Sequence, residues 1–169
     1  MITTVPSPTL AGLHATDEVP ATRMLVRTAA GLGYATMLRA VVPVDAGDVL
    51  DINGRARVSN NTSPGYTIGV GYHLWMYDVD NGLGANGLWT RISSFCGDNV
   101  DVTRHHMPLL VDTLYTVPAD WPVDPDTGKS HRMVIALRAD AHSTAADGQY
   151  LTVDPEYGQL TVRRYKPAA

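Results

Sequence analysis

The sequence predicts an all-β protein, a two-layer β-sandwich built as a jelly roll of about eight strands, with an extended N-terminal arm. Three observations lead to this fold class. Segments of alternating apolar and polar residues recur along the chain, clusters of Gly, Asn, Asp and Pro separate them at fairly even spacing, and the helical period is almost absent. An immunoglobulin-type sandwich is the alternative, but the lone Cys96 excludes its usual inter-sheet disulfide.

The composition indicates one globular domain. The chain has 169 residues, of which 44% are hydrophobic and 18% are charged, and this is enough apolar material for a core. A net charge of −4 gives no basic surface for nucleic acid, and the basic pair Arg163-Arg164 reads as a solvated strand end. No segment has the apolar length of a membrane span or the pattern of a signal peptide. We expect a soluble product of the cytosol.

The first segment, residues 1–21, is predicted to be an arm, and residues 22–169 the sandwich domain. Pro6, Pro8 and Pro20 exclude a regular helix from the arm, and its apolar residues alternate too little for a core strand. A purely solvating tail would not need apolar side chains, so we expect the arm to become ordered by docking on a neighbouring subunit or a particle. A frayed terminus is the alternative. The proposed docking residues are Val5, Leu10, Leu13 and Val19.

The strands begin after the arm. Residues 23–28 and 34–44 are predicted strands, and an Asp-Ala-Gly-Asp turn follows them. In residues 49–60 apolar and polar residues alternate, as in a strand with one face in water. A turn cluster at residues 60–65 favours antiparallel pairing between this strand and the next one.

Residues 66–78 form the longest and most apolar predicted strand, and the sandwich is organised around it. One face, from Tyr66 to Met76, is apolar at every second position. The other face carries glycines and large amphipathic side chains instead of charges, so we expect it to be covered as well. We assign this face to the interface of a homo-oligomer, through His73, Trp75 and Tyr77.

The remaining strands follow a loop rich in Gly and Asn at residues 79–87. In one of them, Leu110 and Leu114 lie on the face opposite the apolar one, which indicates that this strand is partly covered on both sides. The predicted strands cover residues 88–93, 107–117, 131–140, 150–153 and 159–163.

Candidate chemistry is sparse, and we expect no enzyme, no metal ion and no cofactor. His105 and His106 are adjacent and would point to opposite faces of a strand, so they are poorly placed to share an ion. The run from Asp78 to Gly82 resembles the start of a calcium loop, but Trp89 stands where an EF-hand has its closing glutamate. A plain acidic turn is therefore the preferred interpretation.

Exposed aromatic residues leave glycan binding open as a second function. Trp89 lies next to the glycine-rich loop, where polar side chains could surround a sugar stacked on its ring. The residues proposed for this glycan contact are Trp89, Asp80, Asn81 and Asn86.

Five segments together resemble small accessory structural proteins of tailed phages that infect actinobacteria. They are GDVLDINGRARVSN, GYTIGVGYHLWMYDVDN, HHMPL, RMVIALRADAHS and TVRRY, and the resemblance covers about residues 23–165. It implies a jelly-roll component of the virion without catalytic residues, a capsid decoration, head-fibre or related minor tail protein that is often trimeric. It also implies assembly in the host cytoplasm with other virion proteins such as the major capsid protein. We expect a capsid decoration or minor capsid protein. The alternative is a minor tail or carbohydrate-binding protein that attaches the virion to cell-wall glycans of the host.

Overall fold

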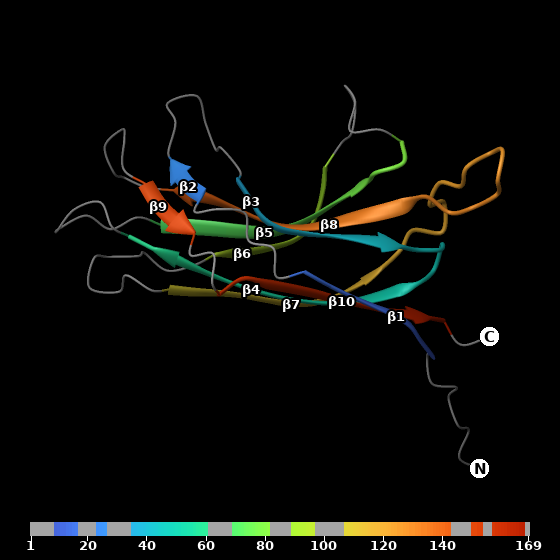
Figure 1. The fold of residues 1–169 in the computed structure, drawn as a ribbon, viewed down its shortest axis with the longest axis horizontal. Coiled ribbons are helices and arrows are strands. Elements are labelled where there is room, and N and C mark those ends of the chain that lie inside the picture. Colours follow the sequence, from blue (N-terminus) through green and yellow to red (C-terminus); the bar gives the residue numbers. More distant parts are fainter. Residues whose placement is uncertain are drawn as a thin grey trace, which may run out of the picture.

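The computed structural model describes residues 9–16, 23–26, 35–60, 69–81, 89–96, 107–142, 150–153 and 157–167. Within these ranges the chain forms antiparallel strands in two layers, which Figure 1 shows one above the other. None of the described residues belongs to a helix that could cross a membrane. The strands are β1 (Thr9–Thr16), β2 (Arg23–Val26), β3 (Ala35–Pro43), β4 (Val49–Ser59), β5 (Gly69–Asp78), β6 (Thr90–Cys96), β7 (Met107–Thr116), β8 (Arg132–His142), β9 (Tyr150–Val153) and β10 (Gln159–Lys166).

The strand order is that of a jelly roll. One layer, here called the β4 sheet, has β1, β10, β4 and β7 side by side, and the short strands β9 and β2 extend it at one end. The other layer, the β5 sheet, has the order β3, β8, β5, β6. The chain crosses repeatedly between the two sheets, which produces two packed antiparallel layers of four main strands each. The predicted fold class is confirmed.

The core lies between the sheets and follows the predicted alternation in β4. Leu50 and Ile52 are fully buried, while the alternate residues Asp51 and Asn53 point outward. Gly54 occupies an inward position where a Cβ atom would lie 2.6 Å from Cγ2 of Val111. The close approach of β4 and β7 therefore requires glycine at this position.

Strand β5 is central in its sheet, between β8 and β6, and is covered on both faces as predicted. Its inner face joins the core through Val70 and Leu74. On the outer face, Tyr77 is 3% exposed and Trp89 from the same chain packs against it. At Tyr77 this face is therefore covered by a residue of the same chain.

Two sequence-based expectations are wrong. Strands β4 and β5 are not neighbours, because β4 pairs with β10 and β7 whereas β5 pairs with β8 and β6 in the other layer. Residues 9–16, expected to form no strand, make β1, which pairs antiparallel with β10. Backbone hydrogen bonds to a neighbouring edge hold such a strand, so it does not need an alternating apolar face.

Candidate functional site

The outer face of the β4 sheet arranges its side chains in rows across four strands. Residues that are directly opposite in antiparallel strands point to the same face. One of these rows has a leucine at each end. It consists of Leu13 on β1, Arg163 on β10, Asp51 on β4 and Leu114 on β7. Nη1 of Arg163 donates a hydrogen bond of 3.2 Å to Oδ2 of Asp51. Leu13 and Leu114 are 61% and 71% exposed, so this row has an ion pair at its centre and an exposed apolar side chain at each end.

The two rows on one side of this central row are mainly polar. Thr161, Asn53 and Asp112 form one row, and Gln159, Arg55 and Leu110 form the next. Side chains of both rows, together with Phe95 of β6, line a depression of about 590 Å³. Together with the first row, this face therefore exposes leucine side chains around a polar centre.

The outer face of the β5 sheet carries an aromatic cluster. The rings of Tyr77 and Trp89 meet edge to face with 4.3 Å between their centroids. The guanidinium carbon of Arg138 lies 4.5 Å from the centroid of Trp89 and 5.3 Å from that of Trp75. One cation therefore faces two indole rings, and the aromatic surfaces are used within the chain.

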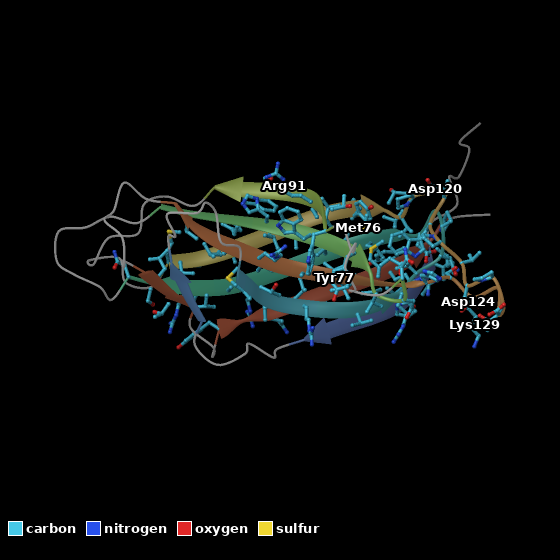
Figure 2. All side chains as sticks on the ribbon, turned by 90° about the horizontal axis from the view of Figure 1, so that it is seen from above. Met76, Tyr77, Arg91, Asp120, Asp124 and Lys129 are labelled. Carbon is cyan, nitrogen blue, oxygen red and sulfur yellow. The ribbon has the colours of Figure 1, made fainter. Side chains whose placement is uncertain are left out.

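One end of the sandwich is held by ion pairs, and Figure 2 shows Asp124 and Lys129 in the loop that extends from this end. Arg164 of β10 donates from Nε to Asp48 at 2.5 Å and from Nη2 to Asp45 at 2.7 Å. Lys166 and Ser130 also donate to Asp45. The hydrogen bond from Lys166, followed by that from Ser130, lowers the pKa of Asp45 to about 2. These contacts fasten the end of β10 to the turn between β3 and β4.

A second set of contacts joins the end of β5 to the start of β8. Nδ1 of His131 and Oδ2 of Asp78 are 2.6 Å apart, and Arg132 binds Asp80 through Nε, Nη2 and its backbone N–H. The side-chain hydrogen bonds from Arg132 lower the pKa of Asp80 to about 2. Both sets line a groove of about 550 Å³ whose described charged groups largely neutralise one another.

The acidic turn after β5 uses its carboxylates for protein contacts. Oδ1 of Asp78 accepts hydrogen bonds from the backbone N–H groups of Asp80 and Asn81. Asp80 itself binds Arg132. Among the described residues, no group of three or more His, Cys, Asp or Glu side chains is arranged to hold a metal ion.

The residues proposed for the subunit interface lie on the outer face of the β5 sheet. His73 and Tyr77 are 7% and 3% exposed in the single chain, and Trp75 is half-buried. A partner could therefore cover little more of His73 and Tyr77. The assignment of these residues to an interface stays a prediction.

The proposed particle-docking residues are only partly described. Leu10 and Leu13 lie on β1 and are 54% and 61% exposed. Val5 and Val19 lie outside the described residues. Because Leu10 and Leu13 are opposite Tyr165 and Arg163 of β10, they belong to the outer face of the β4 sheet.

The proposed glycan-contact residues are not brought together as expected. Trp89 is half-buried against Tyr77 and faces Arg138, and the carboxylate of Asp80 is bound by Arg132. Asn81 is exposed in the turn, while Asn86 lies outside the described residues. Nothing among the described contacts joins Trp89 to Asp80 or Asn81.

Sequence reasoning missed the pair of Asp48 and Arg164. The sequence pattern places Asp48 in a turn and Arg164 in a solvated strand end, yet their side chains are 1% and 13% exposed. The inward position of Arg164, between the outward Arg163 and Tyr165, was a usable signal, because a charged residue on an inner face needs a partner.

No family model and no curated protein matches this chain. The solved structures to which the chain is similar include two of infectious bursal disease virus, from its Gx and Gt strains, and one of a D431N mutant VP2 protein of that virus in derived T=1 particles. The Gx strain chain is 13% identical with a TM-score of 0.48, and the match covers 100% of this chain and 40% of that one. The Gt strain chain is 11% identical with a TM-score of 0.46, and the match covers 96% of this chain and 38% of that one. The mutant VP2 protein is 13% identical with a TM-score of 0.45, and the match covers 100% of this chain and 39% of that one. This chain thus spans about two fifths of each.

Proposed function

We propose that this chain is a non-enzymatic structural protein of a phage virion, a capsid decoration or minor capsid protein that forms homo-oligomers and docks on the particle. The observation that carries the proposal is the outer face of the β4 sheet, where exposed leucines flank a polar centre. Leu13, Leu110 and Leu114 are each at least 61% exposed on this face. Such side chains have a physical use if another protein covers them.

The position of these leucines supports an assembly role. They project from regular strands rather than from loops. The strand order of a jelly roll is compatible with this role, although a fold alone does not define a function. The resemblance of the segments between residues 23 and 165 to accessory virion proteins supplies the phage virion as the setting.

The other polar clusters fit a supporting role in this proposal. The ion pairs of Asp48 with Arg164 and of Asp80 with Arg132 join separate segments at one end of the sandwich. The cation and aromatic contacts of Arg138 and Trp89 cover part of the β5 sheet. These contacts stabilise the domain that presents the β4 sheet.

The test is to purify virions of the phage that encodes the chain, separate heads from tails, and analyse both fractions by quantitative mass spectrometry. The proposal predicts that the chain copurifies with heads in a fixed ratio to the major capsid protein. Its absence from virions would overturn the structural role, and its recovery with tails alone would replace decoration of the capsid by a tail function.

A further inference from the structure

We infer that the outer face of the β4 sheet binds the same face of a second copy of this chain, forming a two-fold symmetric dimer. That the chain forms an oligomer rests on the proposed function. The cross-strand rows identify the surface through which it does so. Its basis is that the pattern of charge and apolar side chains on this face is complementary to itself.

The strand order defines the symmetry operation. On the outer face, β1 and β7 are the outer strands of the row, and β10 and β4 lie between them. A two-fold axis parallel to the strands and midway between β10 and β4 places β1 of one copy on β7 of the other. The same axis places β10 on β4, so each strand meets a different strand of the partner.

The row through the Arg163–Asp51 ion pair shows the complementarity. Its order from β1 to β7 is apolar, positive, negative, apolar: Leu13, Arg163, Asp51, Leu114. The two-fold rotation reverses this order, so each Leu13 meets a Leu114 and each Arg163 meets an Asp51. Four charges of alternating sign would then lie at the centre, between two pairs of leucines.

The exposure of these side chains leaves room for the contact. The Arg163 and Asp51 side chains are 41% and 23% exposed although they already bind each other. Leu13 and Leu114 have most of their surface in water. Burial of the two leucine pairs would exclude water from the charges and strengthen their attraction.

Adjacent rows contain no conflict of charge under the same rotation. In one row, Thr161 meets Asn53, which allows hydrogen bonds across the axis. In the next row, the neutral Gln159 meets Arg55, so the exposed arginines of the two copies do not face each other. On the other side of the central row, Tyr165 meets Val49.

The available area is compatible with a reversible dimer. Four strands about 4.8 Å apart, each with about eight residues at about 3.3 Å per residue, form a face of about 500 Å². A face-to-face pair would bury about 1,000 Å² in total, the lower limit for a specific interface. A two-fold contact closes after two copies, so the inference favours a dimer over the trimer predicted from the sequence.

The test is sedimentation velocity of the full chain from about 1 µM to about 200 µM. The wild type should reach about twice its chain mass of 18.2 kDa. Asp51→Arg and Arg163→Asp should each raise the dissociation constant at least about tenfold, because like charges would meet across the axis. The double variant Asp51→Arg/Arg163→Asp should dimerise again, because exchanging the two charges restores the alternating signs.

Leu114→Lys provides a variant that leaves the ion pair intact, and it should also weaken the dimer. Arg39→Asp is the matched control, since Arg39 is exposed on the other sheet and its reversal should leave the dissociation constant unchanged. Circular dichroism serves as the check that each variant is folded. A wild-type monomer at the highest concentration, a trimer, or a dimer unaffected by both Asp51→Arg and Leu114→Lys would overturn the inference.

The two proposals can fail separately. A chain that is monomeric in solution but present on phage heads would refute the dimer and leave the virion function standing. A dimer sensitive to Asp51→Arg that is absent from virions would support the interface and refute the virion function.

Discussion

Arg164 donates a hydrogen bond to Asp48 across the end of the sandwich, with 2.5 Å between Nε and Oδ2. The Asp48 side chain is 1% exposed, so its charge depends on this partner for compensation. The contact joins the last strand, β10, to the turn between β3 and β4, and it therefore spans 116 positions of the sequence.

Replacing Asp48 should destabilise the fold, because it leaves the largely buried Arg164 with fewer acceptors. We expect Asp48→Ala to lower the free energy of unfolding by about 3 kcal/mol. Urea denaturation followed by circular dichroism measures the change. Lys129→Ala, in the exposed loop between β7 and β8, is the control and should change this free energy by less than about 0.5 kcal/mol.

Acid should weaken the fold in a defined pH window. The folded-state pKa values of Asp45 and Asp80 are about 2, below the ordinary value of 3.8. A lowered folded pKa contributes stability that is present above the unfolded value and is lost as the pH falls through the folded value. The urea concentration at the midpoint of unfolding should therefore decrease as the pH is lowered from about 4 to about 2.

The matched variants for this pH dependence are Asp80→Asn and Asp120→Asn. Asp80→Asn should reduce the slope of the midpoint against pH in that window, because it removes one of the carboxylates that lose stabilising contacts on protonation. Asp120→Asn, at an exposed position that Figure 2 labels, should leave the slope unchanged. Equal slopes in wild type and Asp80→Asn would contradict the assignment.

Gly54 should tolerate no side chain. A Cβ atom at this position would be 2.6 Å from Val111 and 3.3 Å from Leu160, so we expect Gly54→Ala to cost about 2 kcal/mol of unfolding free energy. Adding Val111→Ala removes the nearest obstructing atom. The loss in the double variant should be smaller than the sum of the two single losses by at least about 0.5 kcal/mol. Additive losses would show that the obstruction lies elsewhere.

Trp89 should contribute to stability through its contacts with Tyr77 and Arg138. We expect Trp89→Ala to lower the free energy of unfolding by about 2 kcal/mol, less than for a fully buried tryptophan because the side chain is half-buried. Tyr157→Ala is the control. Tyr157 is 49% exposed and its ring contacts the guanidinium of Arg57, so the loss of this side chain should cost at most about 1 kcal/mol.

Local patterns were sufficient to predict much of the fold. The alternation from Leu50 to Val58 identified β4 and its inner face, and the lack of charges opposite the apolar face of β5 identified a strand covered on both sides. The sequence also predicts that the second face of β7 is partly covered at Leu110 and Leu114. This prediction is wrong within the single chain, where these residues are 61% and 71% exposed.

Non-local relationships could not be predicted in the same way. The pairing of β1 with β10 depends on backbone groups, which a side-chain pattern does not report. The assignment of β4 and β5 to different sheets depends on which strands compete for their edges. The contact between Asp48 and Arg164 requires the turn between β3 and β4 to meet the end of β10, and neither residue alone reveals its partner.

The most direct test of the structural role is rebinding to particles that lack the chain. Heads are prepared from a phage in which the encoding gene has been deleted, the purified chain is added, and bound protein is measured after sedimentation. We expect saturable binding, with a fixed number of chains per major capsid protein. A chain that stays in the supernatant at all concentrations, while the heads sediment intact, would contradict the proposed role on the capsid.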